Sequence, residues 1–208
     1  MTRLLNIQSS PRGSQSASIA VADAFLSAYL AAHPETSIDT LNLFEENLPE
    51  YDAEAIGAKY KGAADQSMDP AETALWDTIK RLAGRFQQAD RIVMGVPMWN
   101  FAYPYKLKQL IDLASQRNML FTFDGTNFGP KLSTPKALVI YTRGQSYAEG
   151  SVTPASTYDY QTGFIDFWLK FIGVEEVVSL TVENTWSDEA EQRITAGKAE
   201  AAVLARTF

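Results

Sequence analysis

The chain has 208 residues, a net charge of −7, and hydrophobic (46%) and charged (21%) fractions ordinary for a globular protein. The acidic balance argues against nucleic-acid binding, which needs a basic surface, and no segment approaches the roughly 20 apolar residues that span a bilayer. The N-terminus lacks the apolar core of a signal peptide. We therefore expect one cytoplasmic domain, residues 1–208, that binds neither nucleic acid nor membranes.

The residue types that support demanding side-chain chemistry are scarce. There is no cysteine, which excludes disulfides, thiol nucleophiles and cysteine-held metal centres. The single histidine, His33, lies beside Pro34 near the end of a predicted helix, where a solvated side chain is expected. A Ser-His-Asp hydrolase and a metal site are therefore not expected, and difficult chemistry would have to come from a bound cofactor.

The first elements suggest an anion site. A predicted strand, residues 3–8, leads through a loop of small polar residues, 9–16, into a predicted helix, 16–32. A helix N-terminus offers free N–H groups, and serine hydroxyls and a glutamine amide add neutral donors. The loop lacks the dinucleotide and Walker A fingerprints, which favours a single terminal phosphate. The alternative is that Ser14 or Ser16 only caps the helix.

The next part of the chain is less regular. A second strand is predicted over residues 37–43, and residues 44–70 follow without a regular pattern. A long irregular connection inside a compact domain is usually functional. The run Asp69-Pro70-Ala71-Glu72 is typical of a helix start, and we predict a helix from there to Phe86.

The central stretch of the sequence suggests a site for a flat ligand. Residues 91–97 form an apolar run that predicts a buried strand, which Pro97 ends. A helix is predicted from Pro104 to Gln116. The intervening loop holds Trp99 and Phe101 on either side of an amide, Asn100, at the carboxyl end of a strand, where open α/β sheets bind ligands. We interpret this loop as half of a flavin site.

The remaining elements complete an alternating pattern. An aromatic excursion or hairpin is predicted over residues 118–130, followed by a strand over 135–142 and a glycine-containing loop over 143–147. A helix is predicted over 157–172, and its apolar face carries Phe164, Phe167, Trp168 and Phe171. The last elements are a strand over 174–182 and a final helix that Ser187-Asp188 caps, with Glu189 and Glu191 in its first turn.

Five strands that alternate with helices predict an α/β fold: a flavodoxin-like doubly wound parallel sheet, order 2-1-3-4-5. In that order the first, third and fourth strands end side by side. Their loops, 9–16, 97–101 and 142–145, offer phosphate donors, aromatics with an amide, and backbone donors beside a glycine. These match the phosphate, isoalloxazine and pyrimidine edge of FMN.

Nearly the whole chain resembles the FMN-dependent NADH:quinone oxidoreductases, also called azoreductases. Pro97-Met98-Trp99-Asn100-Phe101, followed by Leu107-Lys108 and Asp112, resembles the P-M-Y-N-F…L-K…D signature of that family. Residues 9–16 resemble its phosphate loop, and Thr142-Arg143-Gly144-Gln145 resembles its S-R-G-G loop. Trp99, Thr142 and Gln145 replace tyrosine, serine and glycine, so the substrate range is open.

The resemblance implies a cofactor site and a mechanism. The implied FMN-binding residues are Ser10, Ser14, Gln15 and Ser16 for the phosphate, Met98, Trp99, Asn100 and Phe101 for the flavin ring, and Thr142, Arg143, Gly144 and Gln145 for its pyrimidine side. NAD(P)H would pass hydride to the flavin N5, and a quinone or azo compound would then take two electrons, in a ping-pong cycle without a catalytic side chain.

The resemblance also implies a homodimer with its active sites at the interface. Residues 44–70 and the aromatics Phe121, Phe123 and Phe128 are then candidates for a pocket roof or interface. Two rival hypotheses remain, a flavodoxin-type electron carrier without its own substrate and a flavin-free signalling domain of the same fold.

Overall fold

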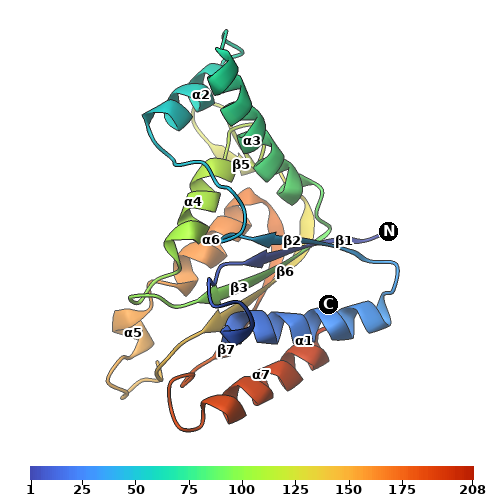
Figure 1. The fold of residues 1–208 in the computed structure, drawn as a ribbon, viewed down its shortest axis with the longest axis vertical. Coiled ribbons are helices and arrows are strands. Elements are labelled where there is room, and N and C mark those ends of the chain that lie inside the picture. The colour runs from blue at the N-terminus through green and yellow to red at the C-terminus, as the bar shows by residue number, and fades with distance from the viewer.

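The computed structural model describes all 208 residues, except for the side chain of Pro135. Five strands form a parallel sheet in the order β2-β1-β3-β6-β7, which confirms the predicted topology (Figure 1). The strands are β1 (Arg3–Gln8), β2 (Ser37–Asn42), β3 (Arg91–Pro97), β6 (Thr134–Thr142) and β7 (Val174–Val182).

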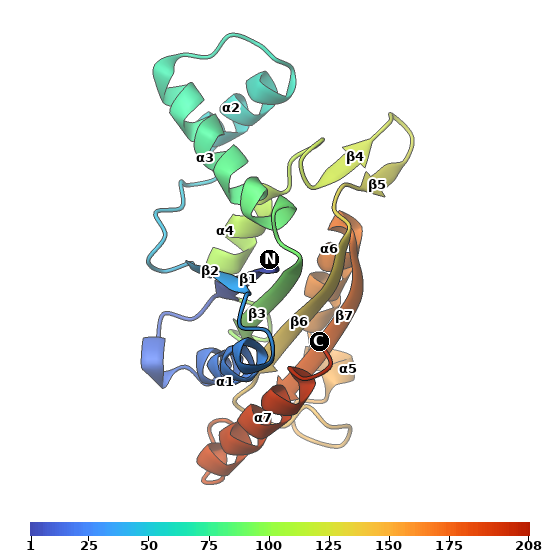
Figure 2. The ribbon, with the colours of Figure 1, turned by 90° about the vertical axis from the view of Figure 1, so that its right-hand side faces the viewer.

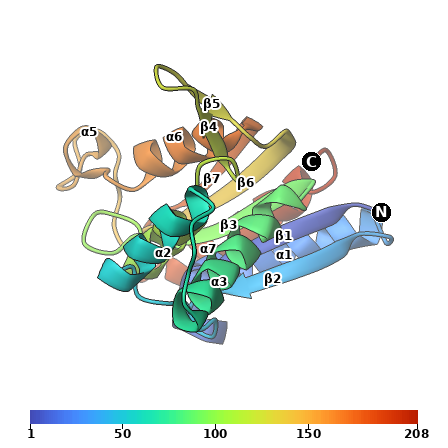
Figure 3. The ribbon, with the colours of Figure 1, turned by 90° about the horizontal axis from the view of Figure 1, so that it is seen from above.

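Helices cover both faces of the sheet (Figure 3). Helices α1 (Ala17–Ala32) and α7 (Ala190–Leu204) pack on one face, and α3 (Pro70–Gln87), α4 (Tyr105–Ala114) and α6 (Thr162–Ile172) lie on the other. Successive strand residues point to opposite faces. Leu4 and Val93 therefore join the core beneath α1, while Leu5 and Ile92 join the core beneath α3.

Residues 44–70 were predicted to form an irregular connection. This prediction is wrong in part, because the connection contains helix α2 (Ala53–Ala63). The Asp52 carboxylate caps this helix by accepting hydrogen bonds from the N–H groups of Glu54 and Ala55, both at 3.0 Å. Its glycines weaken the helical signal in the sequence. Gly62 is nevertheless needed, because a Cβ there would overlap with the indole of Trp76 in α3.

The predicted start of α3 is confirmed by its capping box. The Asp69 carboxylate accepts from the Glu72 N–H at 2.9 Å, and the Glu72 carboxylate accepts from the Asp69 N–H at 3.0 Å. The final helix, in contrast, begins at Ala190 and not at the predicted Ser187-Asp188 cap. The Ser187 hydroxyl accepts a hydrogen bond from the Glu189 N–H at 3.2 Å and so closes a separate turn before α7.

The single helix predicted over residues 157–172 is wrong: the segment forms a short α5 (Ala155–Tyr158) and α6. The break occurs at Asp159, whose Oδ1 accepts hydrogen bonds from the N–H groups of Gln161 at 2.9 Å and Thr162 at 3.0 Å. These bonds satisfy the first free donors of α6. Phe167, predicted on the apolar face of this helix, is 62% exposed.

The predicted aromatic excursion is an antiparallel hairpin of β4 (Phe121–Phe123) and β5 (Phe128–Pro130). It projects beside α6 (Figure 2), and Phe121 and Phe128 both contact Phe171 of that helix. Among the described residues, no helix is both long and apolar enough to span a bilayer.

Candidate functional site

Three loops meet at the carboxyl ends of the adjacent strands β1, β3 and β6. The Ser9 N–H and hydroxyl both donate to the Gly95 carbonyl oxygen, at 3.3 Å and 2.7 Å, which ties the first loop to β3. The Met98 N–H donates to the Thr142 carbonyl oxygen at 2.8 Å, which ties the central loop to the end of β6. The structure therefore brings together the three segments that the sequence singled out.

Two adjoining cavities lie between these loops. The first, the serine crevice, has a volume of about 120 Å³, and the second, the aromatic cavity, about 280 Å³. Met98, Gly144 and Trp186 line both. The other residues are Ser10, Arg12, Ser16, Ala17, Pro97, Trp99, Thr142 and Thr185 in the serine crevice, and Asn100, Phe101, Gln145, Tyr147 and Thr153 in the aromatic cavity.

The first loop divides into lining and non-lining residues. Ser10 and Ser16 are buried and line the serine crevice, whereas Ser14 and Gln15 are exposed and line neither cavity. Ser16 is also the helix cap, because its hydroxyl accepts from the Ile19 N–H at 3.5 Å. It is thus both the cap of α1 and part of the crevice wall.

Free donors lie at the start of α1. In the part of the chain that the structure describes, the N–H groups of Ala17 and Ser18 donate no hydrogen bond to the protein. Such groups at a helix N-terminus favour an anion. The exposed Arg12 adds a positive charge at the rim of the crevice.

The central loop is a strained two-residue turn. The Trp99 N–H donates to the Ala102 oxygen at 2.7 Å, and the Ala102 N–H donates back at 3.0 Å. Asn100 (φ 47°) and Phe101 (φ 69°) occupy the left-handed region, as in a type I′ turn. Asparagine tolerates this backbone, but for phenylalanine it costs about 1–2 kcal/mol. Strain of this kind clusters at functional sites.

The side chains of this turn line different cavities. Asn100 and Phe101 line the aromatic cavity, and among the described residues the Asn100 amide forms no hydrogen bond with the protein. Trp99 lines the serine crevice instead, with its ring centroid 6.0 Å from that of Phe44 and 6.5 Å from that of Tyr105. The two aromatic residues around Asn100 therefore do not form a common face.

The third loop contributes backbone donors to the aromatic cavity. The N–H groups of Gly144 and Gln145 donate no hydrogen bond within the described residues. Both residues line the cavity, and Thr142 lines the neighbouring crevice. The predicted contribution of this loop, donors beside a glycine, is therefore available in the structure.

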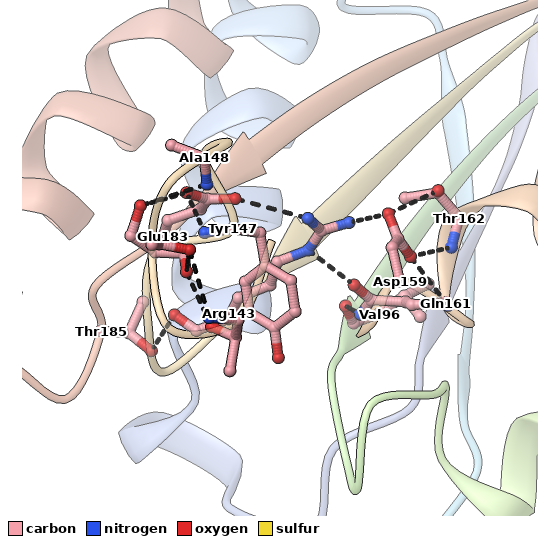
Figure 4. A network of polar contacts seen from close by, with 12 residues as sticks. Val96, Arg143, Tyr147, Ala148, Asp159, Gln161, Thr162, Glu183 and Thr185 are labelled. Atoms are coloured by element: carbon pink, nitrogen blue, oxygen red, sulfur yellow. Dashed lines mark hydrogen bonds and ion pairs between the residues drawn. The ribbon is translucent and has the colours of Figure 1, made fainter. Parts of the chain in front are cut away.

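Arg143 lines neither cavity. Its guanidinium lies between two carboxylates, with Nη2 2.6 Å from Asp159 Oδ2 and Nη1 3.3 Å from Glu183 Oε1 (Figure 4). Its Nε donates to Gln161 Oε1 at 3.1 Å, and Gln161 Nε2 donates to the Val96 oxygen at 2.8 Å. Arg143 therefore joins the third loop to the α5–α6 junction and to β3.

This network also lowers the pKa of Asp159. Burial raises the pKa of the Asp159 carboxyl, but hydrogen bonds from Thr162 and Gln161 and the charge of Arg143 outweigh burial and hold the pKa below its ordinary value. Tyr147 packs against the guanidinium, 4.7 Å from ring centroid to Cζ. Burial raises the pKa of its phenol, so Tyr147 presents a neutral wall to the aromatic cavity.

Seven lining residues were not among the predicted site residues: Arg12, Ala17 and Pro97, which lie in or next to the three predicted site loops, and Tyr147, Thr153, Thr185 and Trp186, which lie outside them. Thr185 and Trp186 follow β7, which pairs with β6. The rule that ligands bind at the carboxyl ends of strands points to this loop as well. A signal was therefore present in the sequence for Thr185 and Trp186, whereas Tyr147 and Thr153 lie farther along the loop after β6.

A doubly wound parallel sheet with a polar and an aromatic cavity at the ends of its strands defines a flavodoxin-like protein. The family model described as a flavodoxin-like fold matches residues 2–204. The sequence is 58% identical over 206 residues to FMN-dependent NADH:quinone oxidoreductase 2 of Burkholderia lata, covering 99% of this chain and 100% of the relative. It is 42% identical over 206 residues to FMN-dependent NADH:quinone oxidoreductase 3 of Pseudomonas fluorescens, covering 97% and 95%.

Solved structures agree with the sequence relatives. A crystal structure of azoreductase from Bacillus anthracis str. Sterne matches with a TM-score of 0.90 and 27% identity, covering 100% of both chains. The chain therefore belongs to the family of FMN-dependent NADH:quinone oxidoreductases, within the flavodoxin-like fold.

Proposed function

We propose that this protein is an FMN-dependent oxidoreductase that transfers two electrons from NAD(P)H to quinones and aromatic azo compounds. The observation that carries the proposal is the pair of adjoining cavities, one with hydroxyl and N–H donors and one with aromatic walls, at the ends of adjacent strands. This pairing fits a ligand with a phosphate at one end and a flat ring at the other. The names of the relatives support the same activity.

The serine crevice holds the phosphate in this proposal. The hydroxyls of Ser10 and Ser16 and the free N–H groups of Ala17 and Ser18 are the donors, and Arg12 supplies the charge. Because Ser14 and Gln15 are exposed and line neither cavity, their part in phosphate binding stays a prediction from the resemblance.

The aromatic cavity holds the ring. The Asn100 amide and the N–H groups of Gly144 and Gln145 donate to the polar edge of the ring and stabilise negative charge there. Phe101 and Tyr147 would form aromatic walls of the cavity that holds the ring. FMN, when bound, supplies the acceptance and release of hydride. No side chain needs to act as an acid or base, and the cavity admits NAD(P)H and then the acceptor in turn.

Mixing the FMN-loaded protein with NADH in a stopped-flow spectrometer tests this function. We expect the absorbance band of the oxidised flavin to bleach rapidly and to return when benzoquinone is added, because donor and acceptor use the same cavity in turn. Slow or absent bleaching by both NADH and NADPH would support an electron carrier without its own substrate. A colourless protein that takes up no FMN would support a flavin-free domain.

We also propose that the protein works as a homodimer. Phe128 on β5 and Phe167 on α6 are 63% and 62% exposed, and they are continuous with Phe171. Together with Phe121 and Phe123 they form one aromatic surface, the hairpin patch. A second copy of the chain is the occupant we favour, since the resemblance described above implies a homodimer and the exposed aromatic side chains of this patch would be buried by it. The cytoplasmic location and the single-domain organisation also remain predictions.

Phe167→Glu tests the dimer. A carboxylate in the hairpin patch would have to lose its water on association, so we expect a dimer to become a monomer in analytical ultracentrifugation. Fold should be retained, because this side chain is mostly exposed. Val203 on α7 is about equally exposed (60%), so Val203→Glu is the matched control. This variant should sediment as a dimer, like wild type. A wild-type monomer would contradict the homodimer, and a dimer that survives Phe167→Glu would contradict its assignment to the hairpin patch.

A further inference from the structure

Trp186 has an unusual position for a large apolar side chain. It is 76% exposed, although it lies at the meeting point of the serine crevice and the aromatic cavity and lines both. An exposed indole on a monomer surface gains free energy when another aromatic group covers it. Because Trp186 borders the site, its exposure indicates that a bound ligand could cover the indole.

Hydrogen bonds hold the backbone of Trp186 in place. The turn that carries it is docked on the third loop, since the Trp186 N–H donates to the Gly144 oxygen at 3.2 Å and the Thr185 N–H donates to the Arg143 oxygen at 3.0 Å. The Thr185 hydroxyl also donates to the Arg143 oxygen, at 2.9 Å. The position of Trp186 therefore depends on that of the third loop, and the buried Arg143 anchors this loop to the rest of the fold.

The indole packs directly on Gly144. A Cβ at residue 144 would overlap with three atoms of the indole, Cδ2, Cε3 and Cε2, all of which belong to its six-membered ring. Only glycine leaves room for this contact. The indole therefore closes over the backbone at the boundary of the two cavities and leaves the rest of its surface free for a ligand.

The boundary limits what can pass between the cavities. A ligand that occupies both must pass Met98, Gly144 and Trp186, the three residues common to the two linings. The crevice beyond them measures about 120 Å³, well below the roughly 300–1,000 Å³ typical of drug-sized ligand pockets. It suits a terminal phosphate and is too small to enclose a further nucleotide.

We propose, on the basis of the function proposed above, that Trp186 is a specificity-determining residue that selects mononucleotide over dinucleotide flavins. Its indole packs against the flat ring and forms the side wall of the crevice, next to Gly144, beside a single phosphate. Without the indole, the crevice opens toward solvent beside Gly144, and the adenylyl half of a dinucleotide can extend outward.

Titration calorimetry of the apoprotein with FMN and, separately, FAD tests this inference without any measurement of activity. Wild type should prefer FMN. Trp186→Ala should weaken FMN binding about tenfold, through the lost aromatic contact, while FAD binding changes less or improves. The dissociation constant for FAD divided by that for FMN should therefore fall, by about tenfold where FAD binding is unchanged and by more where it improves. Trp186→Phe, which keeps an aromatic ring at this position, should keep most of the wild-type preference.

Several results would overturn the inference. An unchanged FMN affinity in Trp186→Ala would show that the indole does not contact the ring. An equal loss of affinity for FMN and FAD would show that Trp186 does not select between them. Loss of folding is not expected from so exposed a side chain, and thermal denaturation of each variant checks this. A wild-type protein that binds neither flavin would overturn the proposed function, and this inference with it.

Discussion

Replacing Arg143 with methionine is expected to destabilise the fold by about 3 kcal/mol, because it leaves the partly buried carboxylates of Asp159 and Glu183 without their partner. The Arg143 side chain is 5% exposed and that of its partner Asp159 13% exposed, so water cannot fully replace the guanidinium. Urea unfolding followed by circular dichroism measures the loss. Because Arg143 also anchors the third loop, we expect the variant to release FMN more readily even where it is folded.

Arg193→Met is the matched control for this prediction. Arg193 pairs with Glu189 at 2.7 Å, but both side chains are at least half exposed, and removing such a pair costs about 0–1 kcal/mol. A similar loss in both variants would contradict a special role of the buried network.

The pH dependence of stability should follow the same network. The pKa of Asp159 is lowered in the folded protein, so the stability it contributes is present above the ordinary value of 3.8 and disappears as the pH falls through the lowered pKa. In Arg143→Met the cation that helps to lower this pKa is gone. Acid unfolding of the variant is therefore expected to begin at a higher pH than in wild type.

Asn100→Gly is expected to weaken FMN binding about 3- to 10-fold while the fold keeps its stability. The amide forms no hydrogen bond with the described residues, so its removal leaves no protein group unpaired. A lost hydrogen bond to an uncharged polar ligand edge is worth about 0.5–1.5 kcal/mol. Glycine also suits the backbone of residue 100, which has a φ of 47°. Flavin titration and thermal denaturation of the same sample check both statements.

Alanine at this position is a less clean substitution, although it is the one the sequence by itself suggests. The left-handed backbone disfavours a Cβ without a local hydrogen-bonding group, so Asn100→Ala should also lose about 1 kcal/mol of stability. Wild-type FMN affinity in Asn100→Gly would contradict the role of the amide, whatever the alanine variant does.

The sequence by itself determined the sheet and the place of the site. Apolar runs such as residues 91–97 are long enough, and bounded clearly enough by proline, to define a buried strand without knowledge of its neighbours. The alternation with helices then predicts the strand order, and the strand order predicts which loops meet. These features depend on local periodicity and on chain connectivity, both of which are present in the linear sequence.

Only the tertiary structure decided which way the side chains of the site point. Arg143 lies in a run that resembles a cofactor-binding loop, yet its guanidinium binds Asp159 and Glu183, 16 and 40 residues away. Asp159, one of these partners, also lies between the end of α5 and the start of α6. The turn after β7 brings Trp186 over Gly144. The physical reason is that a charged or aromatic side chain takes the partner that burial leaves beside it, and that partner comes from a segment distant in the chain.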